Sequence, residues 1–410
     1  MWKNQRLRIL FVLGFPNPFP GAAWTRVGFF ATHWSRRGHL IEVLGAFGYR
    51  SLRKRGVRKV ENVNIFNIIP NVGVISPLAF VLNTLISFLV SVIFLLVRKP
   101  NIIIISVPPG DVGIGAIMAC KLLRAKYIID YRDEWGDYAI SIVSNELGKF
   151  FFSTIKKIAM TFYLHSRLIT TVTPNLRRIL IGKGLRNIML VTNGVDITIF
   201  KPYDKAIIRS KLGLCMNDFI IAYNGTIGNY YRLDVVIRAL KKLNNNLRDK
   251  VKLLIVGSGP DLSKIIHIAK ELGLGDNILY LGEKNDKKEL AEILSAADAG
   301  IIPYDDNPLW RNSVPAKFYE YCACGLPVIA TVHGDSLLGK LIKKYRVGII
   351  SPPLDEGKLA EVICYVYENK SFRLAASSKA RLLIEKEFDR NKISEEFLNL
   401  VKEVIECEIK

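Results

Sequence analysis

Two side chains that could do chemistry together stand in residues 312–330, NSVPAKFYEYCACGLPVIA: the amine of Lys317 and the carboxylate of Glu320. Pro315 is typical of a first helical position and Gly325 of the turn after a helix, so the sequence predicts a short helix followed by a buried strand. The free amides of a helix N-terminus carry partial positive charge and suit a phosphate, with Lys317 beside them. The alternative is an exposed ion pair of two neighbouring helical residues that carries no function.

The segments on both sides of this helix follow a regular pattern of alternating strand and helix signals. Short β-branched runs alternate with helical patterns in both halves of the chain, from ILFVLGF at residues 9–15 to VGIIS at residues 347–351. This alternation predicts an α/β protein with two parallel sheets and helical crossovers. Because ligands bind at the carboxyl ends of strands in such sheets, the loops that follow the strands are the candidate binding loops.

The length of 410 residues, half of them apolar, fits two packed domains better than one. A polar stretch at residues 200–214 separates the last strand of the first half from FIIAYNG. We therefore predict an N-terminal domain over 1–202, a C-terminal domain over 203–384 and one amphipathic helix over 385–410. The six cysteines form no CxxC pair, which indicates reduced thiols in a cytosolic protein, and the N-terminal apolar run lacks a cleavage site and is predicted to be the first core strand.

The net charge of +21 lies mostly in the N-terminal half, where residues 1–200 carry 26 Lys and Arg against 9 Asp and Glu. Its densest run is RSLRKRGVRK, residues 50–59, and a long apolar stretch follows at residues 77–99. Since no zinc-finger spacing, RNP-like motif or basic region with heptads is present, we expect no nucleic-acid partner. A basic run near an apolar helix favours the surface of a membrane.

Residues 78–97 form an apolar run long enough to span a bilayer, interrupted by Asn83, Thr84, Ser87 and Ser91. The run lies between two strands predicted for one sheet, and its polar residues recur every three to four positions along one face. We therefore expect a crossover helix that lies on the cytoplasmic surface of the membrane, with peripheral attachment through residues 50–99. The alternative is a buried core helix of a soluble enzyme.

The chain resembles the GT-B glycosyltransferases of family 4 in segments that occur in the family's order. The matching segments are residues 15–45, NIIIISVPPGDVGIGA (101–116), YIIDYRDEWGDYA (127–139), VTNGVDITIFKP (191–202), IAYNGTIGNYYRLDVVIRAL (221–240), LLIVGSGPD (253–261) and residues 312–330, whose PxKxYEY helix marks one branch. The resemblance implies two facing Rossmann-like domains with the C-terminal helix packed back on the first. It also implies retaining transfer of a sugar from a nucleoside-diphosphate sugar to a glycan or lipid-linked acceptor, without a cofactor or bound metal.

In that family the PxKxYEY helix carries an E-x7-E motif. Its second acid corresponds to Glu320, which would bind the ribose hydroxyls of the donor, since a carboxylate accepts from two vicinal hydroxyls together. Its first acid, which acts near the donor sugar, corresponds to Asn312. An amide there can recognise the sugar but cannot supply the negative charge, so the catalytic role of Asn312 is in question.

The family's phosphate-binding Arg and Lys are missing, since Thr226 and Tyr231 occupy their positions in the loop GTIGNYYRLD, residues 225–234. The charge of the diphosphate would then be balanced by Lys317 and by backbone amides. The remaining donor-side candidates are in the same loop and at the start of the helix: Gly225, Gly228, Arg232, Ser313 and Val314. The glycines could equally form an ordinary tight turn.

On the acceptor side, Gly21 and Ala22 follow the first strand, where the family has a glycine-rich loop near the diphosphate and acceptor. Asp130, Arg132 and Asp133 end the strand YIIDYRD, and Asp133 is the candidate for contact with the acceptor hydroxyl. An N-cap or an ion pair with Arg132 is an equally good explanation of Asp133.

Two other classes of protein remain as alternatives. A dehydrogenase would need GxGxxG after a first strand, and neither half of the chain has it. A basic protein that binds nucleic acid or membranes without transferase activity would explain the charge alone. The absence of any D-x-D motif from the sequence agrees with transfer that needs no metal.

Overall fold

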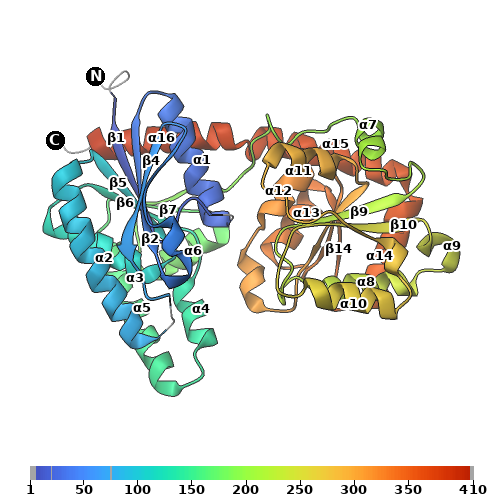
Figure 1. Ribbon diagram of the computed structural model, residues 1–410, viewed down its shortest axis with the longest axis horizontal. Coiled ribbons are helices and arrows are strands. Elements are labelled where there is room, and N and C mark those ends of the chain that lie inside the picture. The colour runs from blue at the N-terminus through green and yellow to red at the C-terminus, as the bar shows by residue number, and fades with distance from the viewer. Residues whose placement is uncertain (1–5, 20, 74–75, 407–410) are drawn as a thin grey trace. The chain divides into compact units, whose positions relative to one another are not determined.

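The computed structural model describes residues 6–19, 21–73 and 76–406 and divides the chain into two compact units (Figure 1). Unit 1 contains Met1–Thr192 and Asn391–Lys410, and unit 2 contains Asn193–Arg390. The sequence placed these boundaries at 202 and 385. They shift because backbone hydrogen bonds join Val195 to Phe388 and Arg390, at 2.9 Å each, and so hold the connecting segment in unit 2.

Unit 1 is built on an eight-stranded sheet whose order is β3-β4-β2-β1-β5-β6-β7-β8. Its strands are β1 (Arg8–Leu13), β2 (Leu40–Phe47), β3 (Gly56–Val60), β4 (Val63–Pro70), β5 (Ile102–Val107), β6 (Tyr127–Tyr131), β7 (Leu168–Thr171) and β8 (Ile188–Leu190). All neighbours are parallel except β3 and β4. The antiparallel edge strand β3 was not predicted. It overlaps the second half of the basic run 50–59, and the 3-10 helix η1 (Tyr49–Lys54) overlaps the first half.

Two groups of helices cover the faces of this sheet (Figure 1). One face carries α1 (Ala22–Arg36) and the C-terminal helix α16 (Arg390–Glu406), whose Phe397 ring lies 5.3 Å from the ring of Trp34. The other helices are α2 (Pro77–Arg98), α3 (Gly110–Leu122), α4 (Trp135–Ile142), α5 (Glu146–Leu164) and α6 (Pro174–Gly182). The predicted single helix over 385–410 is wrong, because the chain breaks at Phe388 and Asp389 where it meets Val195.

Unit 2 has a six-stranded parallel sheet in the order β11-β10-β9-β12-β13-β14. Its strands are β9 (Phe219–Asn224), β10 (Val251–Val256), β11 (Ile278–Tyr280), β12 (Ala299–Pro303), β13 (Val328–Thr331) and β14 (Gly348–Ser351). Its helices are α7 (Lys205–Lys211), α8 (Leu233–Lys242), α9 (Asn245–Arg248), α10 (Leu262–Glu271), η2 (Gly275–Asn277), α11 (Lys287–Ser295), η3 (Pro308–Asn312), α12 (Ala316–Ala323), α13 (Leu337–Tyr345), α14 (Glu356–Glu368) and α15 (Lys370–Glu387). The predicted pair of parallel sheets with helical crossovers is confirmed.

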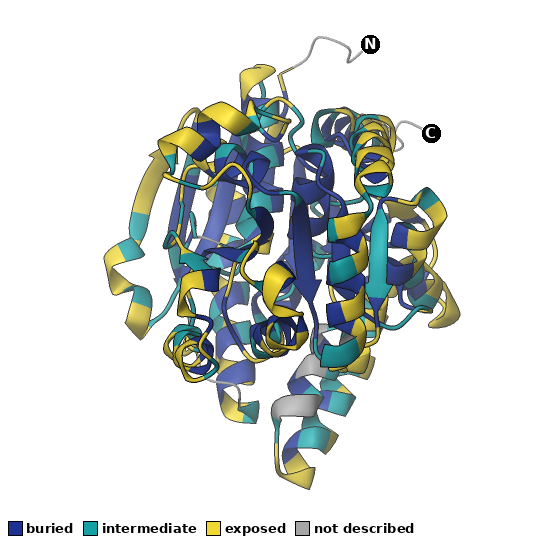
Figure 2. Ribbon diagram, turned by 90° about the vertical axis from the view of Figure 1, so that its right-hand side faces the viewer, coloured by how far each residue is buried: buried dark blue, intermediate teal, exposed yellow. Residues whose placement is uncertain are grey.

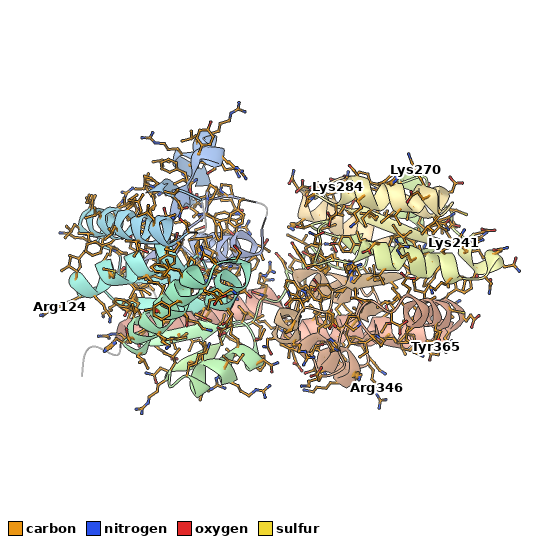
Figure 3. The ribbon with its side chains drawn as sticks, turned by 90° about the horizontal axis from the view of Figure 1, so that it is seen from below. Arg124, Lys241, Lys270, Lys284, Arg346 and Tyr365 are labelled. Carbon is orange, nitrogen blue, oxygen red and sulfur yellow. The ribbon has the colours of Figure 1, made fainter. Side chains whose placement is uncertain are left out.

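Burial and capping explain why these elements form. The central strands of both sheets are almost wholly buried, and most helices have one buried and one exposed face (Figure 2). Lys241 and Lys270 of unit 2, labelled in Figure 3, are exposed. Ser336 and Asp355 cap helices α13 and α14 by accepting from backbone amides. Within the described part of the chain, α12 has no such side-chain cap.

Candidate functional site

The carboxyl edge of the sheet in unit 2 brings together the loop after β9 and the start of α12. The sheet order places β9 between β10 and β12, so the loops that follow these three strands are neighbours. The loop 225–232 is joined to the end of β12, since Arg232 N donates to Pro303 O at 2.7 Å and Asp305 N donates to Tyr230 O at 3.1 Å. Helix α12, whose first turn has no side-chain cap, therefore begins beside a loop that presents backbone groups.

Glycines let two of these loops lie against each other. Gly225 has φ of 111°, and its amide donates to Val256 O at 2.9 Å. A Cβ atom on Gly257 would lie 1.9 Å from Gly225 O, and one on Gly259 would lie 2.0 Å from Ile227 O. The segment IVGSGP therefore packs directly against the loop 225–232. Its two glycines were missed as site residues, although two glycines directly after a buried strand are a signal for close backbone approach.

Lys317 lies in the first turn of α12 with only 5% of its surface exposed. Its Nζ lies 3.3 Å from the ring centroid of Tyr231 and 4.0 Å from that of Tyr223. Among the residues that the structure describes, this Nζ has no hydrogen-bond partner. Burial lowers the pKa of Lys317 well below its usual value, and the Glu320 carboxylate opposes that shift. A buried amine without a partner is unfavourable for folding, and such groups are typical of ligand sites.

Glu320 lies one turn further along α12 and is 7% exposed. Its Oε2 accepts from Asn224 Nδ2 at 2.7 Å, and the backbone amide of Asn224 donates to Tyr321 Oη at 3.1 Å. The carboxylate is thus fixed at the end of β9. Because Lys317 and Glu320 are both buried, the alternative of an exposed ion pair is wrong.

A series of ring contacts leads away from Tyr231, whose ring lies over Lys317, and we call its four members the aromatic wall: Tyr230, Tyr231, Tyr304 and Trp310. The rings of Tyr231 and Tyr304 stack with centroids 5.2 Å apart, and those of Tyr304 and Trp310 stack at 4.9 Å. Tyr230 lies 4.8 Å from Tyr231 and 5.5 Å from Trp310 and is 38% exposed. The sequence offered no periodic signal for this cluster, since its members come from two loops that meet only in the folded unit.

The other donor-side candidates differ in their exposure and in whether their polar groups already have partners. Arg232 makes a two-pronged ion pair with Asp234, at 2.8 Å and 2.6 Å, so its guanidinium is already engaged. Thr226 is exposed and Gly228 is buried in the same loop. Asn312 is exposed at the end of η3, Ser313 is half-buried and Val314 is buried. Pro315 is the N-cap of α12 and not its first residue, and Gly325 has φ of 71° after the helix, as predicted.

Asp130, a predicted acceptor-side residue of unit 1, is engaged inside the fold. Its carboxylate accepts from Arg26 at 3.0 Å and 2.9 Å and from Thr170 Oγ1 at 2.8 Å. Burial alone would raise the pKa of Asp130, but the Arg26 guanidinium outweighs that effect, so the pKa is lowered. These contacts account for Asp130 as a residue that stabilises the fold of unit 1.

The neighbouring candidates lie at the same carboxyl edge of the unit 1 sheet. Arg132 is 7% exposed and donates through Nη2 to Pro108 O, while its Nε has no partner among the described residues. Asp133 is exposed directly after it. Gly21 is the N-cap of α1, where a Cβ atom would lie 2.3 Å from the Phe19 ring, and Ala22 is exposed in the first turn. The edge therefore presents one buried guanidinium, one exposed carboxylate and an uncapped helix start.

This chain is similar to known proteins in sequence and in fold. Residues 204–383 match the family model described as glycosyl transferases group 1. The chain is 29% identical over 203 residues to D-inositol 3-phosphate glycosyltransferases of Mycobacterium bovis (strain BCG / Pasteur 1173P2) and Mycobacterium tuberculosis (strain ATCC 25177 / H37Ra). The match covers 46% of this chain and spans 40% of the length of those relatives.

Solved structures resemble the whole chain. Sucrose-phosphate synthase from Thermosynechococcus elongatus has a TM-score of 0.77 and 16% identity, over 98% of this chain and 100% of that one. Anabaena HepE in complex with UDP has a TM-score of 0.72 and 17% identity, over 97% and 100%. Residues 204–383 thus match the glycosyl transferases group 1 family, and the chain has the fold of the GT-B glycosyltransferases.

Proposed function

We propose that this protein is a retaining glycosyltransferase of family 4, in the branch with the PxKxYEY helix. It transfers a hexose from a nucleoside-diphosphate sugar to a hydroxyl of a glycan or lipid-linked acceptor. The observation that carries the proposal is the pair of Lys317 and Glu320, buried side by side where α12 begins at the end of β9. Structures of HepE with UDP and with UDP-glucose support a nucleotide-sugar donor for this fold.

The geometry of the donor site suits the two halves of a nucleoside diphosphate. The fixed carboxylate of Glu320 accepts hydrogen bonds from the two ribose hydroxyls. Lys317, the amides of Thr226 and Gly228 and the first turn of α12 surround the diphosphate with positive charge, whereas the amides of Gly225 and Ile227 already donate to Val256 and Ser258. The leaving nucleoside diphosphate is then stabilised by groups already in place, and no divalent cation is required.

The sugar end of the donor lies toward Asn312, Ser313 and the aromatic wall. Flat aromatic faces with a few polar groups are typical of small-molecule sites, and the members of the wall with exposed surface for a sugar ring are Tyr230, 38% exposed, and the half-buried Trp310. Asn312 recognises sugar hydroxyls as donor and acceptor but carries no charge. Acceptor binding belongs to the carboxyl edge of unit 1, where Arg132 and Asp133 have polar groups available and Gly21 and Ala22 begin α1.

A thermal-shift panel tests the proposal. Nucleoside diphosphates and their sugars are added singly at about 100 times a micromolar dissociation constant, where a bound ligand stabilises the folded state by about 2.7 kcal/mol. A rise in melting temperature with one nucleoside diphosphate and its sugars, but not with the nucleoside alone, supports the proposal. No rise with any member of the panel would count against it.

Lys317→Met has two expected effects of opposite sign. It removes a buried amine without a partner, so the free energy of unfolding rises by on the order of 1 kcal/mol. It also removes the charge next to the diphosphate, so donor binding weakens by about 1.5–3 kcal/mol. Chemical denaturation and calorimetric titration with a nucleoside diphosphate measure both effects on the same sample. If Lys317 were purely structural, Lys317→Met would lower the free energy of unfolding and leave the donor affinity unchanged.

The pH dependence of these effects follows from the lowered pKa of Lys317. The unfolded chain binds more protons than the folded chain between that lowered pKa and the ordinary value of 10.5, so wild-type stability rises with pH through this window. The advantage of Lys317→Met shrinks over the same window. Diphosphate binding favours the ammonium form, so wild-type donor affinity falls as pH rises above the lowered pKa, and this component is absent from Lys317→Met.

Asn312→Glu restores the acid that the family has at this position. Because the new carboxylate lies near the reacting sugar and not at the diphosphate or ribose, we expect turnover to change more than donor affinity. Steady-state kinetics with varied donor separates kcat from the binding of the donor. Arg311→Gln, at the exposed neighbour, lowers the net charge by the same single unit and controls for the charge alone. Equal changes in turnover and affinity, or no change in either, would contradict a place for Asn312 beside the sugar.

A further inference from the structure

Helix α2 is built with its polar face inward and its apolar face outward. Asn83, Ser87 and Ser91 are buried, at 2%, 0% and 2% exposure. We define the apolar face of α2 as the side chains on its other side, each between 43% and 80% exposed: Leu78, Val81, Leu82, Leu85, Leu89, Ile93, Leu96 and Val97. Helices on the surface of soluble proteins have the opposite arrangement, so this face is made for contact with something apolar.

Specific contacts fix the polar face of α2 against unit 1. Asn83 accepts from Val72 N at 2.9 Å and donates to Asp111 Oδ2 at 2.9 Å, and Ser87 donates to Val112 O at 2.9 Å. A Cβ atom on Gly115 of α3 would lie 2.5 Å from Thr84 O, so α2 and α3 lie backbone to backbone. The helix therefore cannot turn its apolar face inward without losing these hydrogen bonds.

The apolar face extends onto neighbouring helices of unit 1. The ring of Phe80 on α2 lies 5.9 Å from that of Phe152 on α5, so these helices lie side by side, as Figure 1 also shows. These neighbours also carry exposed apolar side chains: Leu147 and Phe150 of α5 are 78% and 72% exposed, and Leu122 of α3 is 63% exposed. Exposed apolar side chains are therefore present on three neighbouring helices of unit 1.

Exposed cations lie beside α2 and α3, and the exposed acid beside Leu147, Glu146, is paired with Lys149. Lys59 of β3, Lys99 after α2 and Arg124 after α3 are exposed, and Arg124 extends outward in Figure 3. None of the three forms an ion pair with the described residues. Lys59 is two residues after Val57, which pairs with Phe66, and Phe66 contacts Phe94 of α2, so Lys59 lies on the sheet face that α2 covers. The exposed cations Arg50, Arg53, Arg55 and Arg58 belong to the same edge.

We propose that the apolar face of α2, with its cationic border, docks this protein on the surface of an anionic lipid bilayer. An apolar helical face beside cations matches a bilayer with anionic headgroups. A second copy of this chain would instead bring cations against cations. By length and composition α2 could also cross a membrane. Docking on the surface agrees better with the fold, because β4 and β5 on either side of α2 belong to one sheet and α2 itself is bonded to α3.

This surface also bears on the identity of the acceptor, and that argument rests on the proposed function. The N-terminal end of α2 lies at the carboxyl edge of the unit 1 sheet, where Asn83 contacts Asp111 in the first turn of α3. Arg132 follows β6 at the same edge. A bilayer on the apolar face would present the headgroup of a lipid-linked acceptor to this edge. The proposal therefore favours the lipid-linked acceptor over a free glycan.

Flotation of the full-length protein with vesicles tests the docking surface. Vesicles of phosphatidylcholine alone are compared with vesicles that also contain phosphatidylglycerol, at about 0.01 M and about 1 M salt. We expect flotation with the anionic vesicles at low salt and weaker flotation at high salt. Leu85→Glu/Leu89→Glu should reduce the bound fraction by about tenfold or more, because both side chains lie in the middle of the apolar face.

Matched controls come from unit 2. Leu374→Glu/Leu382→Glu makes the same change at side chains of α15 that are 61% and 48% exposed. For charge, Arg53→Glu/Lys59→Glu is compared with Lys241→Glu/Lys270→Glu, whose lysines extend outward in Figure 3. We expect both control pairs to float like the wild type. Circular dichroism of every variant confirms that it is folded.

Three results would overturn the proposal. They are no flotation of the wild type with anionic vesicles, unchanged flotation of Leu85→Glu/Leu89→Glu, and a wild-type dimer in analytical ultracentrifugation that this variant dissociates while flotation stays the same. The third result would assign the face to a second copy. The nucleoside-diphosphate thermal shift is measured on the same samples. If vesicles bind but no nucleotide does, the proposed function fails while the docking surface stands.

Discussion

Arg26→Met should be the most destabilising single change among those considered. Arg26 and Asp130 are 3% and 2% exposed and form a two-pronged ion pair within unit 1. Removing the guanidinium leaves a buried carboxylate without its charge partner, which typically lowers the free energy of unfolding by about 3–5 kcal/mol. We expect the melting temperature of unit 1 to fall by about 10 °C in a thermal scan followed by circular dichroism.

The pH dependence gives this prediction a second readout. In the wild type the pKa of Asp130 is lowered, so its contribution to stability is present above the ordinary carboxyl pKa of 3.8 and is lost as pH falls through the folded-state pKa below that value. Without Arg26, only Arg132 and the Thr170 hydrogen bond oppose the effect of burial, so the pKa of Asp130 rises relative to the wild type and the deficit of the variant shrinks as the solution is acidified.

The control for Arg26 is another arginine of α1. Arg36 pairs with Glu61 at the surface, where the two side chains are 66% and 42% exposed, so Arg36→Met should change stability by less than about 1 kcal/mol. The double change Arg26→Met/Asp130→Leu removes both charges and should recover part of the loss. Equal effects of Arg26→Met and Arg36→Met would mean that the buried pair does not stabilise unit 1.

Glu320→Ala should have the largest effect on donor binding. Two charge-assisted hydrogen bonds to the ribose contribute about 1.5–3 kcal/mol each, so the affinity for the nucleoside diphosphate should fall by about 3–6 kcal/mol. The variant should also lose about 1–3 kcal/mol of stability, because Asn224 Nδ2 is left without its partner. The burial of Glu320 is the reason that this substitution affects the fold as well as the donor site.

A 2′-deoxy nucleotide separates the ribose contact from the loss of stability. The wild type should bind the 2′-deoxynucleoside diphosphate more weakly than the ribonucleotide, because one acceptor oxygen of Glu320 then has no hydroxyl. Glu320→Ala should bind the two nucleotides equally in calorimetric titrations. If the variant still discriminates between them, the ribose is held by another group.

Much of the fold could be predicted from the sequence because buried parallel strands are continuous apolar runs. The apolar runs NIIIISV and FIIAYNG predicted the bounds of β5 and β9 within a residue or two. The strand GVRKV of β3 could not be found in this way. As an edge strand it has no buried residue in its middle, so it lacks both the apolar run and the alternation.

The site could be predicted only in part. The sequence pointed to Lys317 and Glu320 through their helix, but the partners that fix them come from far along the chain, such as Asn224, which is 96 positions from Glu320. The aromatic wall was missed for the same reason. For α2 the sequence located the polar stripe correctly, but whether that stripe faces the protein or the solvent depends on α3, which only the fold brings alongside.

Phosphorus-31 NMR of a bound nucleotide sugar is the most direct test that Lys317 and its loop hold the donor. Wild-type protein should shift and broaden both diphosphate resonances of UDP-glucose or of whichever donor stabilises the protein in the thermal-shift panel. Lys317→Met, at a concentration that gives the same fractional saturation, should perturb them much less. The same perturbation by both proteins would place the diphosphate away from Lys317 and contradict the proposed donor site.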